Sequence, residues 1–299
     1  MHVEFVDQVG PSAIRIAFQR MGGSASPPVL LIMGAGAQLI AWPDGFCREL
    51  MNRGLQLIRF DNRDSGLSTH FSQAPKPDFA AVMRGDFTTV TYTLSDMAAD
   101  TVGLMDVLGL GQVHLMGASM GGMIAQTIAI EFPGRVRSLT SIMSTTGNPA
   151  VGKTDYMLLS QLGAPPPDRP GYIEWRVRCL KALGSPTYPF EEQAARELAG
   201  ISWDRDHDPL ALARQSVAVL KSGDRTPQLR QVQVPTLVIH GKADRMIDAS
   251  GGIATANAIP HARLVLFEAM GHSLPAPLWA DLAELVADHV QGAESVRRI

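Results

Sequence analysis

The sequence VHLMGASMGG, residues 113–122, decides the fold that we expect for this chain. Its apolar start at 113–116 predicts a short buried strand, and the following GMIAQTIAI at 122–130 predicts a helix. Between the two stands a G-x-S-x-G pentapeptide with Ser119 at its centre. A turn this sharp strains the serine backbone and admits only small residues on either side. The context therefore favours a nucleophile elbow, with the serine hydroxyl at the carboxyl end of a sheet, over a plain glycine-rich turn.

A nucleophilic Ser119 needs two partners, because a serine hydroxyl requires a histidine base that is itself oriented by a carboxylate. The run TLVIHG at 236–241 predicts a strand, and Asp244 follows its end. The run RLVLF at 263–267 predicts the next strand, and His272 follows that one. The order serine, acid, histidine, each after a strand, predicts a triad of Ser119, Asp244 and His272.

Asp248 is the alternative carboxylate, because it lies four residues beyond Asp244. It precedes Ala-Ser at 249–250 and a predicted helix. An aspartate at such a position caps the helix by accepting a backbone N–H near residue 250 or 251. We therefore expect Asp244 to orient the base and Asp248 to cap the helix.

Seven other histidines are weaker candidates for the base. His114 and His240 lie within predicted strands, where packed and hydrogen-bonded rings are expected. His70 lies in a predicted loop. The remaining four are expected to be solvated: His2, His207, His261 and His289.

An oxyanion hole is the fourth requirement of acyl transfer, and it consists of backbone N–H groups aimed at the developing negative charge. The residue after the nucleophile, Met120, supplies one such group. The glycine-rich loop after the predicted strand 29–32 supplies the other, from Ala35 or, as the second choice, from Gly34. The rival interpretation of this loop is a dinucleotide site, but its G-x-G lacks the third glycine.

The order of elements predicts an α/β fold with a mostly parallel central sheet flanked by helices. Two antiparallel strands are expected within residues 2–21, followed by strands that alternate with helices. This alternation stops after residue 147 and resumes at 233. We therefore predict a core of residues 1–147 and 233–299, with a helical cap inserted at 148–232. Helices within the cap are expected near 153–162, 171–183, 190–200 and 209–222.

The cap is the expected location of substrate selection, because it must present apolar surface to the cleft below. Its large apolar residues are candidate pocket residues: Trp175, Trp203, Met157 and Tyr172.

Three stretches resemble one group within the α/β-hydrolase-fold serine hydrolases. They are Met33-Gly34, Trp42-Pro43-Asp44 and IRFDNRDSGLST at 58–69, which are similar to the aclacinomycin methylesterase group. Many superfamily members carry a histidine where Met33 stands and a glycine where Asp64 stands. Members of the methylesterase group remove a methyl ester from a polyketide antibiotic. The resemblance implies carboxylic ester hydrolysis without a cofactor and leaves the ester itself open.

Serine esterase activity is therefore the expected function. A carbon–carbon hydrolase of ring-cleavage products and a cofactor-free perhydrolase would use the same triad. A ligand-sensing receptor on this fold is the alternative outside enzymes. Because residue 119 is a serine and not an aspartate, haloalkane dehalogenase and epoxide hydrolase chemistry is disfavoured.

Composition excludes several classes of partner. A net charge of −3 over 299 residues predicts no nucleic-acid surface, and no apolar run is long enough for a membrane span. The amino terminus lacks the pattern of a signal peptide, and the two cysteines are expected to be free thiols of a cytoplasmic protein. Asp61 and Asp64 are expected to organise a loop and not to bind a metal. The expected partner is a small-molecule ester; the oligomeric state is open.

Overall fold

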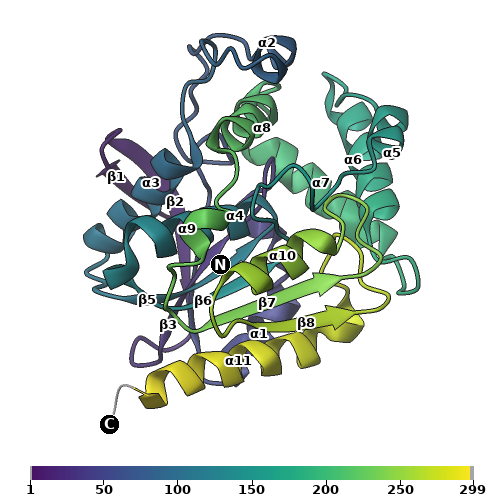
Figure 1. Ribbon diagram of the computed structural model, residues 1–299. Helices are drawn as coiled ribbons and strands as arrows, with labels where there is room; N and C mark the ends of the chain where they lie inside the picture. The colour runs from purple at the N-terminus through teal and green to yellow at the C-terminus, as the bar shows by residue number, and fades with distance from the viewer. Residues whose placement is uncertain (1, 297–299) are drawn as a thin grey trace.

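An eight-stranded sheet forms the centre of the computed structural model, which describes residues 2–296 (Figure 1). The strands follow the spatial order β1-β2-β4-β3-β5-β6-β7-β8, and only β2 runs antiparallel to the others. The predicted strands are all present: β1 (Glu4–Val9), β2 (Ile14–Met21), β3 (Pro28–Ile32), β4 (Gln56–Phe60), β5 (Val113–Ala118), β6 (Val136–Ile142), β7 (Thr236–Gly241) and β8 (Arg263–Phe267).

Helices cover both faces of this sheet, and each face has its own apolar core. On one face, α1 (Asp44–Asn52) packs against α11 (Trp279–Val296). The opposite face is covered by three helices: α3 (Leu94–Val107), α4 (Met120–Glu131) and α10 (Ser250–Ala258). Every residue of β5 is buried because helices lie on both sides of it. The absence of regular apolar–polar alternation in β5 follows from this position.

Five helices lie between β6 and β7, where the cap is predicted. They are α5 (Tyr156–Leu162), α6 (Arg169–Leu183), α7 (Glu192–Arg205), α8 (Ala211–Ser222) and the short α9 (Thr226–Leu229). Figure 1 shows α5 to α7 grouped at the upper right, whereas α8 lies near α2 at the top and α9 lies beside α10. Ala218 and Leu229 belong to the apolar core beside α4, so the last two helices are also part of the core packing.

The boundaries of core and cap at 147/148 and 232/233 remain a prediction, and the outer limits at residues 1 and 299 lie outside the described part of the chain. A shorter helix, α2 (Phe79–Met83), packs against α8 in the segment before α3. Within residues 2–296, no helix has the length and apolar character needed to cross a membrane.

Candidate active site

Ser119 occupies the turn between β5 and α4 in a strained conformation, with φ 57° and ψ −124°. Its N–H donates to the Ile142 carbonyl at 2.9 Å, which ties the turn to β6. A Cβ at Gly117 would lie 2.1 Å from the Gly121 carbonyl oxygen. A Cβ at Gly121 would lie 1.9 Å from the carbonyl oxygen of Ile32. Both glycines of the pentapeptide are therefore required by close backbone approach, as the sequence predicts.

His272 and Asp244 meet at the same edge of the sheet. The ring nitrogen Nδ1 of His272 lies 2.7 Å from Oδ2 of Asp244, although 28 residues separate them. The adjacent parallel pairing of β7 with β8 brings the two loops together. Asp244 is buried, whereas Ser119 and His272 are partly exposed. The Asp244 carboxylate thus binds Nδ1 of the His272 ring. The second ring nitrogen, Nε2, remains free to accept a proton.

The Asp244 carboxylate is held in its ionised form. Burial alone would raise its pKa, but the charge of His272 and hydrogen bonds from His240 and His272 outweigh burial and lower the pKa to about 2. The N–H groups of Met246 and Ile247 also donate to Oδ1, at 2.8 and 2.9 Å. One oxygen is therefore anchored by backbone and the other faces the imidazole.

Asp248 points elsewhere. Its Oδ1 accepts the N–H of Ser250 at 2.9 Å, and its Oδ2 accepts the N–H of Lys153 at 3.2 Å. The Asp248 side chain therefore organises the start of α10 and the segment before α5. The expected bond from Asp248 to a backbone N–H at residue 250 is present, although the N-cap residue of α10 is Ala249 and not Asp248. The catalytic role of Asp244 stays a prediction.

The loop after β3 reaches the nucleophile. A Cβ at Gly34 would lie 2.9 Å from the Cβ of Ser119, so a larger residue at 34 would collide with the elbow. Ala35 follows in a turn that Ala37 closes by donating its N–H to the Gly34 carbonyl at 3.3 Å. Met120 is the first residue of α4, and N–H groups of a first helical turn have no acceptor within the helix. Gly34 thus lies against Ser119, and Met120 follows Ser119 directly; the oxyanion role of Met120, Ala35 and Gly34 stays a prediction.

The other histidines have different surroundings. His114 is buried between Ser138 and Glu294, and the Nε2 of His240 lies 2.8 Å from the carbonyl of Ile247, as expected for packed rings. The expectation of a solvated His289 is wrong, because α11 lays the ring on the sheet, 3.2 Å from the Leu139 carbonyl.

A cavity of about 210 Å³ lies between the cap and the core. Three of the four predicted pocket residues line it: Tyr172, Trp175 and Trp203. The Tyr172 ring centroid lies 5.8 Å from that of Trp175 and 5.2 Å from that of Trp203. The fourth expectation is corrected by the structure: Met157 is 74% exposed and lies outside this lining, because α5 turns it away from the core.

A buried ion-pair network joins the core to the cap beside this cavity, and only the charges of Asp61 and Asp64 pointed to it in the sequence. Arg214 of α8 binds both oxygens of Asp64, at 2.7 and 2.8 Å. Arg205 of α7 binds Asp61 at 2.5 Å. Backbone N–H groups also donate to both carboxylates: those of Leu39 and Leu67 to Asp61, and that of Phe71 to Asp64. This agrees with the expected loop-organising role.

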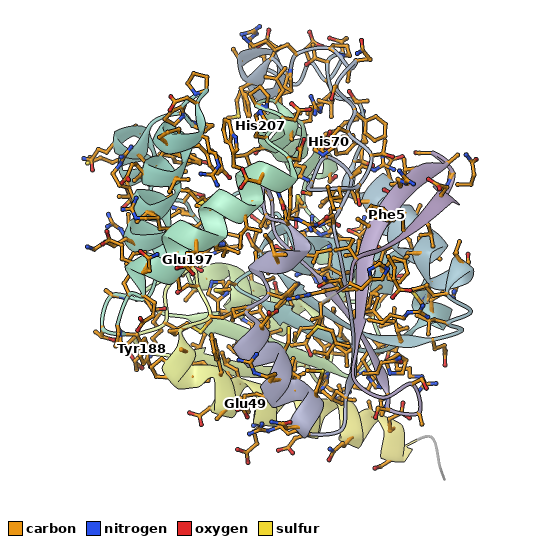
Figure 2. All side chains as sticks on the ribbon, turned by 180° about the vertical axis from the view of Figure 1, so that it is seen from behind. Phe5, Glu49, His70, Tyr188, Glu197 and His207 are labelled. Carbon is orange, nitrogen blue, oxygen red and sulfur yellow. The ribbon has the colours of Figure 1, made fainter. Side chains whose placement is uncertain are left out.

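His70 extends the same network. Figure 2 labels His70 and His207, and the Nε2 of His70 lies 3.1 Å from the neighbouring Asp206. Ligand atoms of Asp64, His70 and Asp208 lie within 4.8 Å of one another, the spacing of a metal site. The guanidinium of Arg214, however, already binds both of these carboxylates. Arg214 therefore supplies the positive charge that a metal would bring.

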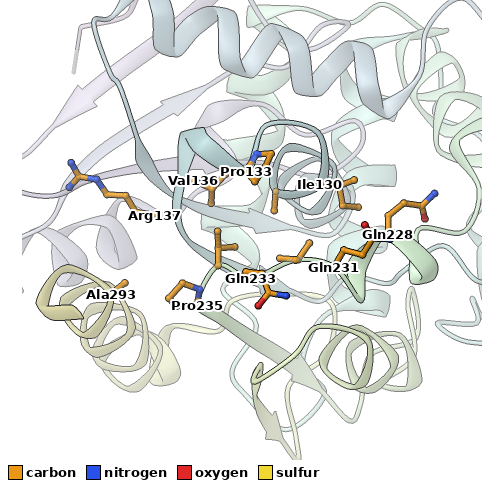
Figure 3. Close-up of a pocket in the computed structure, with 12 residues that line it drawn as sticks. Ile130, Pro133, Val136, Arg137, Gln228, Gln231, Gln233, Pro235 and Ala293 are labelled. Carbon is orange, nitrogen blue, oxygen red and sulfur yellow. The ribbon is translucent and has the colours of Figure 1, made fainter. Parts of the chain in front are cut away.

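A larger cavity, of about 590 Å³, lies at the opposite edge of the sheet (Figure 3). Val136 and Pro235, at the starts of β6 and β7, line it together with Gln231 and Gln233. The residues of the predicted triad follow the ends of their strands, so this cavity is remote from them.

Comparisons with known proteins agree with this architecture. The rhodomycin D methylesterase of Streptomyces peucetius is 28% identical over 297 residues, which cover 91% of this chain and 94% of that protein. The 2-hydroxy-6-oxo-6-phenylhexa-2,4-dienoate hydrolase of Comamonas testosteroni is 32% identical over 178 residues, which cover 57% of this chain and 59% of that protein. An esterase from Rhodococcus sp. ECU1013 has a crystal structure that matches with a TM-score of 0.74 at 22% identity, covering 99% of both chains.

These findings confirm the predicted fold class and support the resemblance to the methylesterase group. A family described as the alpha/beta hydrolase fold matches residues 27–178, which is about half of the chain. The chain belongs to the alpha/beta hydrolase fold family.

Proposed function

We propose that this protein is a serine hydrolase that cleaves small-molecule carboxylic esters through Ser119, His272 and Asp244. One observation carries the proposal: a serine at positive φ in an elbow follows β5, and a histidine hydrogen-bonded to a buried carboxylate stands at the same sheet edge. The similarity to a methylesterase over nine-tenths of the chain supports ester hydrolysis as the reaction.

In the proposed first step, the Oγ of Ser119 attacks the ester carbonyl while the Nε2 of His272 takes its proton. Asp244 fixes the ring tautomer through Nδ1 and stabilises the imidazolium that forms. The N–H groups of Met120 and Ala35 bind the negative oxygen of the tetrahedral intermediate. When this intermediate collapses, His272 returns the proton to the leaving alcohol.

Water completes the cycle. His272 removes a proton from a water molecule that attacks the acyl group on Ser119. The same two N–H groups stabilise the second oxyanion, and the acid leaves when Ser119 regains its proton. No step in this sequence requires a cofactor.

Carbon–carbon bond hydrolysis of a ring-cleavage product is the second candidate, because the Comamonas relative is named as the hydrolase of a dienoate. It covers little more than half of this chain, whereas the methylesterase covers nearly all of it. A spectrophotometric assay with a dienoate ring-cleavage product separates the two reactions. We expect methyl or p-nitrophenyl esters to be turned over faster than the dienoate.

The test of the proposal is Ser119→Ala. Loss of the nucleophile costs on the order of a millionfold in a well-studied protease, so ester turnover should fall by several orders of magnitude with the fold retained. A serine-directed organophosphonate should add one adduct, located on the peptide that contains Ser119. Near-normal ester turnover by the purified variant would refute the proposal.

Location and partners complete the proposal. The free thiols of Cys47 and Cys179 are both buried, which suits a reducing cytoplasm. The proposed partner is the ester alone.

A further inference from the structure

We infer that Gln215 of the cap helix α8 is a positioning residue for the oxyanion loop, an inference that rests on the proposed function. The side chain of Gln215 is completely buried. Its Oε1 accepts the N–H of Gly36 at 2.8 Å. Its Nε2 donates to the Arg63 carbonyl at 2.8 Å and to the Ser65 hydroxyl at 3.1 Å. One amide therefore joins the loop after β3, the loop after β4 and the cap.

The geometry of the turn explains why this contact bears on Ala35. The Gly34 carbonyl accepts the N–H of Ala37, which fixes the peptide plane before Ala35. Gln215 binds the N–H of Gly36, which fixes the peptide plane after Ala35. Because a trans peptide places its N–H opposite its C=O, the bond to the Gly34 carbonyl sets the direction of the Ala35 N–H. The bond from Gly36 to Gln215 holds the next peptide, and with it the turn in which the first bond forms.

The turn would be loose without this contact. Gly36 adopts φ 65°, a conformation that glycine leaves as readily as it enters. Its N–H would also lose its acceptor beneath the cap, where Leu212 covers the glycine. A reacting group displaced by about 1 Å costs on the order of a hundredfold in rate. The position of α8 therefore determines how well the oxyanion donor is aimed.

A purely structural role for Gln215 is distinguishable, because other residues also attach α8 to the core. Arg214 binds Asp64, and the hydroxyl of Ser222 accepts the N–H of Leu94 at 2.9 Å. Ser222 thus provides a matched control on the same helix, with a hydrogen bond to the core that does not involve the oxyanion loop. Removing either bond loosens α8, but of the two residues only Gln215 forms a hydrogen bond with the turn that contains Ala35.

The experiment compares Gln215→Met, Gln215→Glu and Ser222→Ala with the wild type on a small acetate ester. Methionine fills the same space without accepting the Gly36 N–H, whereas glutamate retains an acceptor oxygen. For Gln215→Met we expect kcat to fall by about tenfold to a hundredfold, with KM nearly unchanged. Gln215→Glu and Ser222→Ala should retain kcat close to that of the wild type, even where urea unfolding shows reduced stability.

A trifluoromethyl ketone provides a readout that a structural role would not move. The Oγ of Ser119 adds to the ketone carbon, His272 takes the hydroxyl proton, and the former carbonyl oxygen becomes an anion facing the oxyanion donors. Affinity for this inhibitor should fall in Gln215→Met by the same factor as kcat/KM.

Two results would overturn the inference: wild-type kcat and inhibitor affinity in folded Gln215→Met, or equal losses in all three variants. If Gln215→Met does not fold, an equal loss of kcat in Gln215→Glu and Ser222→Ala decides against it. Ser119→Ala is assayed in parallel. An inactive Ser119→Ala with a fully active Gln215→Met rejects only the inference, whereas an active Ser119→Ala rejects the proposed function and the inference together.

Discussion

Asp64 and Arg214 form a two-point ion pair in which both side chains are buried, with N–O distances of 2.7 and 2.8 Å. Asp64 belongs to the loop after β4, and Arg214 belongs to α8 of the cap, 150 residues away. Asp64 also has φ 58°, a value that is uncommon for residues other than glycine. The hydroxyl of Tyr92 donates to the same carboxylate at 2.7 Å. A strained core residue and a cap residue are thus held together by desolvated charges.

Arg214→Met should lower the free energy of unfolding by about 3–5 kcal/mol, because it leaves the Asp64 carboxylate buried without its cation. Arg214→Lys should recover only part of this loss, since an ammonium cannot reproduce the two parallel hydrogen bonds. Urea unfolding at pH 7 measures both values.

A matched control lies within the cap. Arg169 and Asp204 form the same two-point geometry, with both distances at 2.7 Å, but they are exposed. Arg169→Met should leave the free energy of unfolding nearly unchanged, because exposed ion pairs contribute little. Equal losses at Arg169 and Arg214 would contradict the role assigned to burial.

Asp244→Asn should lower kcat by roughly ten-thousandfold, because asparagine favours the wrong tautomer of His272 and, being neutral, does not stabilise the imidazolium. Asp248→Asn should retain most of the activity, since an asparagine oxygen can still accept the Ser250 N–H at the start of α10. Parallel steady-state kinetics on the two purified variants, with a small ester, check this prediction. The reverse pattern would assign the catalytic acid to Asp248.

The meeting of Asp244 and His272 at one edge of the sheet could be predicted from the sequence, because its signals are local. Gly117 and Gly121 are dictated by backbone contacts of under about 2.2 Å that any residue with a Cβ would create, so the pentapeptide carries its own geometry. β7 and β8 are largely apolar segments, and chain order places Asp244 after the first and His272 after the second. Strand order and loop placement together brought these residues to one edge.

The contacts between cap and core could not be predicted in the same way. Arg214 and Gln215 lie within an ordinary helical segment, and their partners are about 150 to 180 residues away in the chain. Nothing in their own surroundings indicates burial. The predictions of a pocket position for Met157 and of a solvated ring for His289 were wrong for a related reason. The face that a helix presents depends on neighbouring elements that the local sequence does not specify.

His114 should make the protein lose stability in mild acid. Burial, more than any other cause, lowers its pKa to about 4, and it outweighs the opposing charge of Glu294; Arg137 and His289 lower it further. The unfolded histidine titrates near about 6.5. Below that pH the unfolded chain gains a proton that the folded protein does not take up. Stability should therefore fall between about pH 6.5 and pH 4, by about 3 kcal/mol from this group.

Urea unfolding at a series of pH values tests this dependence. His114→Gln removes the titrating group, so its stability should change less between pH 6.5 and 4 than that of the wild type. His261→Asn is the control, because His261 is exposed and at positive φ, a conformation that asparagine tolerates. Parallel curves for the wild type and His114→Gln would show that other groups cause the loss.

Trp175→Ala and Trp203→Ala should change the ratios of rates among esters more than they change the rate with the smallest acetate. Both indoles line the cavity between cap and core, and the Trp175 ring is fixed by donating to the Gly163 carbonyl at 3.0 Å. A large ester can use such remote contacts to stabilise its transition state, whereas an acetate cannot reach them.

The measurement is kcat/KM for a series of esters of increasing size. Met157→Ala is the matched cap variant, because its side chain is exposed and lies outside the cavity lining. Met157→Ala should change kcat/KM by the same factor for all esters, within experimental error. If the two tryptophan variants also changed kcat/KM by one common factor for every ester, the two rings would serve only to pack the cap. Substrate selection would then have to reside elsewhere. A change confined to the larger esters would instead place their acid or alcohol groups against these two rings.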